Sequence, residues 1–410
     1  MKNDSNIEIY RTNHNPFMIL VIIYLVSLVF SMVPVMTDLK YIKYIVAILS
    51  PLFLLPGKVY FKFLDRYLLN NIILYTVIIL ISFLSIALRE DFYQRFFEES
   101  VFILTPAIFT FFLFRYYNPE RKDFYIKFLF WGISISYFIL LFVYNIQGLN
   151  FIINPYDFLI NKERSLVNTS HSFYFVFFVI YFFFKKNNRY LIFSLILFIL
   201  SLKRVSLFGM IVVVVVYLLY KKKEFSEINY KVVLPAAIII NLILVFLIYN
   251  FALGNYDYLF SDYTGRFSDD VVSGRKGIYF VFFEKFDLTK LSLLGEGIGK
   301  VMDVISRYAG YKFNFHSDIL KNYTEMGPVI FIVWIYFMYK INSRNLISLL
   351  YIIYINVLFI SDNAFVYFDV LFLFYFFIGI SQIEQSEQEE MANVETEMEQ
   401  ESENNYAKAE

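Results

Sequence analysis

Long apolar runs follow one another along almost the whole of this sequence, and they limit what it can fold into more than any other feature. Between residues 16 and 381 many of these runs reach about 20 residues, enough for a helix to cross the hydrocarbon core of a bilayer. The composition agrees, because 59% of the residues are hydrophobic and 21% are aromatic, well beyond an ordinary soluble domain. One N-terminal run could be a signal peptide, but a long series cannot. The sequence therefore predicts an all-α polytopic membrane protein.

The apolar runs predict about twelve transmembrane helices. The runs 190–202 and 205–220 are short and could be tilted or half-buried, so the expected range is about eleven to thirteen. The expected spans are 16–36, 41–57, 67–88, 100–117, 124–146, 170–184, 190–202, 205–220, 232–253, 326–340, 345–361 and 366–381.

These spans divide the chain into four parts. Residues 1–253 are expected to hold the first nine helices, and residues 254–325 a polar loop. Residues 326–381 are expected to hold the last three helices. Residues 382–410 are rich in Glu, Gln, Asn and Ser and have almost no large apolar side chains, so they are expected to form a disordered acidic tail.

The distribution of Lys and Arg sets the expected orientation of the helices. One alternating set of short loops, which includes 58–66, 115–127, 185–189 and 221–231, carries about twice as many basic residues as the opposite set. That first set is therefore expected to be cytoplasmic. Both termini would then lie in the cytoplasm, and the large loop would lie outside.

Two short helices are expected in the external loop. The segment SGRKGIYFVFFEKF, residues 273–286, repeats apolar residues at helical spacing and would lie on the membrane surface. A second helix is expected to begin near Ser317, which suits an N-cap and is followed by Asp318 in the first turn. Gly327 and Pro328 are expected to break this helix, with Pro328 as the first residue of the next span.

Several classes of chemistry are excluded or disfavoured. The formal net charge of +0 gives no basis for a nucleic-acid partner. The absence of Cys excludes disulfides, thiolate metal sites and cysteine catalysis. No HxxxH or HExxH motif occurs in the loops expected outside, so no metal is predicted. The GEGIG segment, residues 295–299, lacks the Lys-Ser/Thr of a P-loop, and no cofactor is expected.

Cationic side chains near the outer ends of the expected helices are candidates for a binding site. Lys203 and Arg204 occupy a very short turn, where two cations are costly unless an anion or a cavity compensates them. They could equally be a charged turn that reaches lipid head groups. Arg266 and Arg275 could each be a solvated loop charge, but arginine is also suited to binding phosphate through two parallel hydrogen bonds.

His316 is the candidate for proton transfer. Histidine accepts or donates a proton near neutral pH more readily than other side chains. A lone histidine at the start of a helix is more often structural. The arginines of the same loop and the acids Asp318 and Glu325 favour a functional role.

Three of these segments, in this order, resemble motifs of the O-antigen polymerase and O-antigen ligase family of membrane glycosyltransferases. SLKRVSLFGM resembles the family's Ser-x-x-Arg segment before a very apolar helix, with Arg204 on the motif arginine. SGRKGIYF followed by LLGEGIGK resembles its Gly-Arg and Gly-x-Gly-x-Gly pattern, with Arg275 on the arginine. HSDILKNYTEMG resembles its His-Asn and Glu-x-Gly segment, with His316 and Glu325 in place.

Two further segments are similar to family motifs, and two positions depart from them. KERSLVNTSHS is a fainter match that adds Arg164 and Asn168, and SDNAFVYFDVLF resembles the closing segment of the family. Ser317 stands where Asn is usual, and Lys203 replaces a small residue. The likeness in motifs covers residues 160–380, while the first half matches only in hydropathy.

The resemblance implies glycosyl transfer on the outer face of a bacterial inner (plasma) membrane, without a cofactor or nucleotide sugar. The substrates would be oligosaccharide repeat units of O-antigen or capsule type, carried on polyprenyl diphosphate. Membrane lipids, a chain-length regulator and a flippase are implied partners. Catalytic roles fall to Arg204, Arg275 and His316, and substrate-binding roles to Lys203, Arg266, Arg164, Asn168 and Glu325.

Two other functions are compatible with parts of the pattern. A ligase of the same family would pass the finished glycan to a lipid or protein acceptor, and the motifs do not separate it from a polymerase. A lipid-linked sugar flippase or other transporter would usually show two related halves and ionisable residues at mid-membrane. Here related halves are not evident, and Asp369 is one of few charges within a span.

Overall fold

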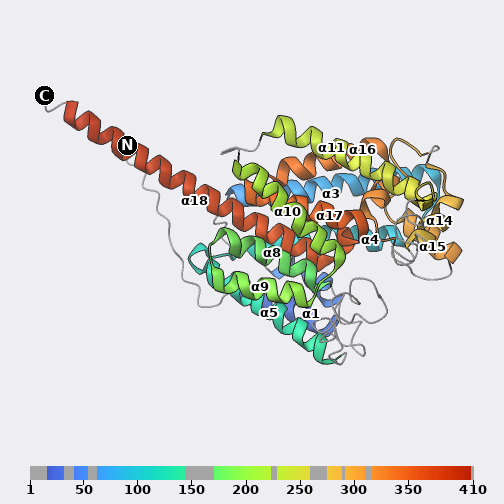
Figure 1. Ribbon diagram of the computed structural model, residues 1–410, viewed down its shortest axis with the longest axis horizontal. Helices are drawn as coiled ribbons and strands as arrows, with labels where there is room; N and C mark the ends of the chain where they lie inside the picture. The colour runs from blue at the N-terminus through green and yellow to red at the C-terminus, as the bar shows by residue number, and fades with distance from the viewer. Residues whose placement is uncertain are drawn as a thin grey trace.

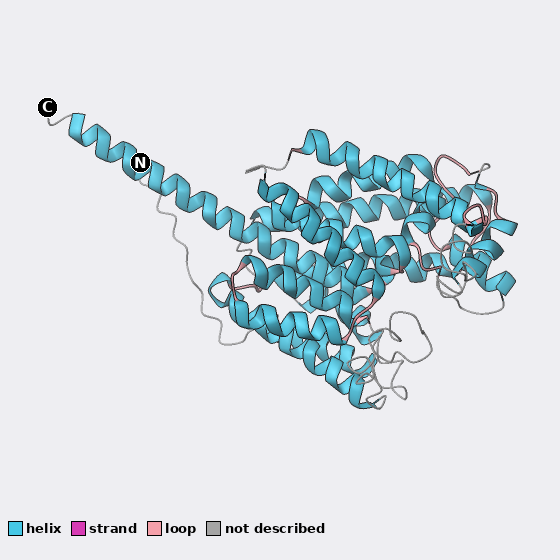
Figure 2. Ribbon diagram, viewed as in Figure 1, coloured by secondary structure: helices cyan, strands magenta, loops and turns pink. Residues whose placement is uncertain are grey.

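The computed structural model describes residues 16–31, 41–53, 62–143, 170–222, 229–258, 275–288, 291–309 and 315–407. Over these residues the chain forms helices and loops without strands (Figure 2). In chain order the elements are α1 (Pro16–Ser31), α2 (Ile42–Phe53), α3 (Lys62–Arg89), α4 (Arg95–Phe114), η2 (Pro119–Arg121), α5 (Lys122–Val143), α8 (His171–Phe184), α9 (Asn188–Leu200), α10 (Arg204–Lys222), α11 (Tyr230–Ala252), α14 (Arg275–Lys285), α15 (Lys300–Ala309), α16 (Asp318–Asn342), α17 (Leu346–Ser361), η5 (Ala364–Val366) and α18 (Phe368–Ala407).

Each apolar run of the sequence coincides with a helix in the described parts of the chain. Seven of these helices are long and apolar enough to cross a membrane, namely α3, α4, α5, α10, α11, α16 and α18. Four more are apolar but shorter, namely α1, α8, α9 and α17. The prediction of a helical membrane protein is therefore confirmed, whereas the number of twelve spans stays a prediction.

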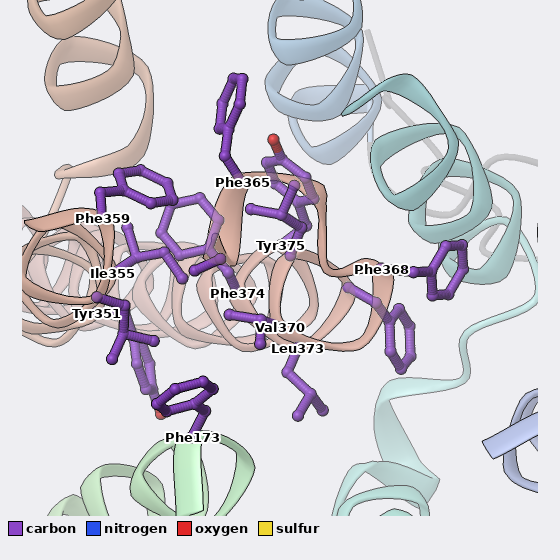
Figure 3. Packing of buried hydrophobic residues seen from close by; sticks show 14 of the residues in the cluster. Phe173, Tyr351, Ile355, Phe359, Phe365, Phe368, Val370, Leu373, Phe374 and Tyr375 are labelled. Carbon is purple, nitrogen blue, oxygen red and sulfur yellow. The ribbon is translucent and has the colours of Figure 1, made fainter. Parts of the chain in front are cut away.

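The apolar part of α18 forms the centre of the bundle. It packs against α3, α4, α8 and α17, and its residues from Phe368 to Ile383 are buried. Figure 3 shows aromatic side chains of α17, η5 and α18 gathered in one cluster with Phe173 of α8. In contrast, Ile211 of α10 and Ile239 of α11 are 52% and 56% exposed, as expected for surfaces that face lipid.

The acidic tail differs from the disorder that its composition predicts. α18 continues as a helix to Ala407 and extends beyond the bundle, at the end opposite α14 and α15 (Figure 1). Its base is fixed, because a Glu384 carboxylate oxygen lies 3.1 Å from Lys122 Nζ and 2.6 Å from Lys185 Nζ. Glu, Gln, Met and Ala are good helix formers, so a helix already nucleated in the bundle can propagate through them.

The predicted break in α16 is confirmed. Gly327 has φ 73° and ψ 165°, which divides α16 into two helices, and Pro328 begins the second. The predicted cap is also present, since the Ser317 side chain accepts a hydrogen bond from the Leu320 N–H at 3.4 Å. The predicted helix at 273–286 corresponds to α14.

The GEGIG segment, Gly295–Gly299, packs against the break in α16 and forms hydrogen bonds with it. The Gly297 N–H donates to the Glu325 carbonyl at 2.9 Å, and carbonyls at the end of a helix lack a helical donor. On the other side, the Ser85 hydroxyl of α3 donates to the Gly295 carbonyl at 2.9 Å. The segment therefore fastens the broken helix to α3 and has a structural role.

Gly295→Ala is expected to destabilise the protein by about 3 kcal/mol. The φ of Gly295 is +74°, and an added Cβ would collide with backbone atoms of Glu325, Met326 and Gly327. Gly254→Ala is the matched control, because Gly254 has φ +83° but its nearest neighbour is an Asp257 side-chain oxygen at 3.0 Å. Melting temperatures of the purified variants test this, and equal losses would contradict the proposed collision.

Candidate functional site

The ends of α10, α14 and α17 meet around the buried carboxylate of Asp362. This residue directly follows α17, and its side chain is 1% exposed. Its Oδ1 accepts hydrogen bonds from the Asn363 N–H at 2.9 Å and from the Tyr367 hydroxyl at 3.1 Å. These bonds fix the carboxylate in the turn that leads into η5.

Lys203 compensates the charge of Asp362. Its Nζ lies 2.7 Å from Asp362 Oδ2 and 4.4 Å from the centre of the Phe173 ring of α8. The cost of two cations in the turn before α10 calls for an anion nearby, and Asp362 is that anion for Lys203. The contact with the Phe173 ring adds a cation–π interaction.

The pKa of the Asp362 carboxyl reflects two opposing effects. Burial raises it, but the charge and hydrogen bond of Lys203, with the Asn363 N–H, outweigh burial and lower it below the usual value. A carboxyl whose folded-state pKa is depressed stabilises the fold above its unfolded-state pKa. That contribution is lost as the pH falls through the folded-state pKa.

Lys203→Met is expected to lower the melting temperature most at neutral pH. Without Lys203, burial of Asp362 is no longer offset, so the pKa of its carboxyl should rise and the variant should take up a proton at higher pH. The difference from wild type should therefore shrink on acidification, beginning above about pH 4. A difference that stays constant from neutral to acid pH would contradict this pairing.

Arg275 is held next to the same turn. It begins α14, and its guanidinium donates a hydrogen bond to the Ser361 carbonyl at 2.7 Å. This carbonyl belongs to the last turn of α17, where carbonyls lack helical donors and the helix dipole favours a cation. An arginine has about five N–H donors, so this bond leaves capacity for an anionic ligand.

His316 adjoins Asp362 from the start of α16. Its backbone has φ 56°, an uncommon conformation for a residue with a side chain. Two bonds hold it there, from its N–H to the Asn363 Oδ1 at 2.9 Å and from the Tyr279 hydroxyl to its carbonyl at 3.1 Å. The imidazole Nδ1 lies 3.9 Å from Asp362 Oδ1, and the side chain is 29% exposed.

The structure therefore brings together Lys203, Arg275 and His316, three candidates from distant parts of the sequence. Asp362 is the centre on which they converge. Lys203 and the His316 imidazole adjoin the Asp362 carboxylate, and the Arg275 guanidinium binds the carbonyl of the preceding residue, Ser361. Lysine and arginine side chains brought together in this way can bind an anionic ligand such as a phosphate.

The other candidates lie elsewhere or outside the described residues. Arg204 is exposed at the first position of α10, beside Lys203. Arg266, Arg164 and Asn168 lie outside the part of the chain that the structure describes.

Glu325 is buried in the fold, with its side chain 1% exposed. Its carboxylate accepts a hydrogen bond from the Val301 N–H at 3.1 Å and lies 3.5 Å from Lys321 Nζ. Lys321 also pairs with Glu99 of α4. In this arrangement Glu325 joins α15, α16 and α4, and its carboxylate contacts protein groups.

Asp362 was not among the predicted site residues. A signal was present, because SDN directly follows an apolar run at its expected outer end, and Lys203 needed an anion. For metals, no group of three or more His, Asp or Glu side chains that could hold an ion occurs among the described residues.

Comparisons with known proteins give no assignment, since no family model, curated protein or solved structure matches the chain.

Proposed function

We propose that the protein is a polymerase of lipid-linked oligosaccharide repeat units, acting on the outer face of a bacterial plasma membrane. The observation that carries the proposal is the convergence of Lys203, Arg275 and His316 around Asp362. Each of the three lies in a segment that resembles a different motif of one glycosyltransferase family. A helical membrane bundle provides the setting that a lipid-linked substrate requires.

The negative charge of the diphosphate leaving group would account for the cationic side chains at the site. In the proposed reaction, a hydroxyl of the incoming repeat unit forms a bond to the anomeric carbon of the growing glycan. The bond from that carbon to the diphosphate oxygen breaks, and polyprenyl diphosphate leaves with the electron pair. Negative charge grows on the diphosphate, so cations already in place stabilise the transition state. Arg275 and Lys203 would supply this charge, with the exposed Arg204 as a further cation.

His316 would take the proton of the attacking hydroxyl. A sugar hydroxyl is poorly acidic, so a base in contact with it lowers the barrier. Asp362 lies 3.9 Å from the imidazole and would favour the imidazolium that forms when the proton is transferred. Lys203 offsets part of that effect, because it shares the same carboxylate.

Glycan length in cells tests the proposal. A strain that lacks the protein is complemented with the wild type or with an empty vector, and the surface glycan is separated on a gel. A ladder with the wild type and a single repeat unit on its final carrier without it would support a polymerase. Accumulation of full-length lipid-linked chains without the protein would identify a ligase. Retention of the repeat unit on the cytoplasmic side would identify a transporter.

A further inference from the structure

A hollow with apolar walls lies between α11 and α16, at their ends remote from the Asp362 cluster. Its volume is about 520 Å³, and its walls include Leu234, Pro235 and Ile238 of α11 and Tyr336 of α16. The two helices pack side by side (Figure 1). Ile239, which also lines the hollow, is 56% exposed, and the nearby Val232 is 62% exposed, so the hollow opens on a surface suited to lipid tails.

Three cationic side chains surround one end of this hollow. Lys231 lines it, and Lys340 Nζ lies 3.3 Å from the Tyr336 hydroxyl. Arg344 directly follows Ser343, whose carbonyl accepts a hydrogen bond from the hydroxyl of Tyr230, another residue that lines the hollow, at 2.8 Å. Within the described residues, none of these three cations pairs with a carboxylate. The charge at this end is therefore not neutralised by the described part of the protein.

An apolar hollow with unneutralised cations at one end is complementary to an amphipathic molecule with a negatively charged head group. An acyl chain fits apolar walls, and a phosphodiester head group complements Lys and Arg. The distribution of basic residues predicts that this end of the bundle faces the cytoplasm, where anionic phospholipids are available. A soluble phosphate compound could bind the cations, but it would leave the apolar walls of the hollow uncovered.

We propose that this hollow binds one anionic phospholipid of the cytoplasmic leaflet. An acyl chain would lie against Leu234 and Ile238, and the phosphate would lie among Lys231, Lys340 and Arg344. The site is separate from the Asp362 cluster and does not depend on the proposed reaction.

Native mass spectrometry of the full chain tests this site, with phosphatidylglycerol and phosphatidylcholine of the same acyl composition supplied in equal amounts. The wild type is expected to retain one phosphatidylglycerol at least about tenfold more strongly than phosphatidylcholine. A variant with Lys231→Gln, Lys340→Gln and Arg344→Gln should lose this preference. Ile238→Trp, which fills the hollow without changing charge, should lose the lipid itself.

The matched control carries the same loss of charge at the same end of the bundle. Lys186→Gln, Arg189→Gln and Lys221→Gln remove three exposed cations that do not line the hollow, and this variant should bind as the wild type does. Equal binding of the two lipids, an equal loss in the control, or retention by Ile238→Trp would overturn the site. Preferential retention of polyprenyl phosphate when it is added would overturn the identity of the lipid.

Discussion

Arg275→Ala is expected to reduce glycan elongation by about a hundredfold or more, which is the usual cost of losing one group that stabilises transition-state charge. The gel should then show a single repeat unit instead of a ladder. Arg275→Lys should restore little, because a lysine cannot bind the Ser361 carbonyl and a diphosphate through one planar group. Membrane expression of each variant is measured in parallel.

Arg307→Ala is the matched control for this change. Arg307 lies in α15, its side chain is 55% exposed, and it pairs with Asp303 at 2.7 Å. Its loss removes the same charge from the same loop, so the ladder should remain. A normal ladder with Arg275→Ala, or an equal loss with Arg307→Ala, would contradict the role given to Arg275.

Asp362→Asn is expected to destabilise the fold by about 3 kcal/mol and to abolish elongation. The change leaves the Lys203 ammonium, which is 19% exposed, without its anion. The double variant Lys203→Met with Asp362→Asn removes both charges and should recover much of the melting temperature. Elongation should stay absent in the double variant, because it lacks both a cation for the diphosphate and the anion beside His316.

Asp123→Asn provides the comparison at a solvent-exposed ion pair. Asp123 is 67% exposed and its partner Lys127 is 35% exposed, and exposed pairs contribute about 0–1 kcal/mol. Its melting temperature should therefore stay close to that of the wild type. If the double variant at positions 203 and 362 were no more stable than Asp362→Asn alone, the pairing would not explain the loss.

The helices were predictable because their signals are local. An apolar run and a Gly-Pro step each act through a few neighbouring residues, so the positions of the helices and the break at Gly327 follow from the sequence. The length of each apolar run also decides whether its helix is long enough to cross the membrane. Short helices such as α8 and α17 leave the number of spans open.

The site was predictable only in part, because its centre depends on contacts between distant segments. Lys203, Arg275 and His316 could be predicted as site residues because each is a cationic or titratable side chain near the outer end of an expected helix. Nothing local shows that Lys203 pairs with Asp362, which lies 159 residues further along the chain. Glu325 illustrates the opposite case, since its place in the motif does not reveal that Lys321 and the Val301 N–H occupy its carboxylate.

The acidic tail was predicted to be disordered from its composition alone, and composition does not show that the segment continues a helix of the bundle. Its first turn is attached to the bundle through Glu384, which pairs with Lys122 and Lys185. A segment of strong helix formers behaves differently when it continues a fixed helix, because the costly nucleation step has already been made.

The most direct test of the proposed function uses the purified protein in liposomes with a synthetic repeat unit on polyprenyl diphosphate. No nucleotide sugar or metal is added, and the lipid-linked products are separated by length. The proposal predicts chains of increasing length and release of one polyprenyl diphosphate for each bond formed, both lost with Arg275→Ala. Movement of intact repeat units across the bilayer without any elongation would contradict it.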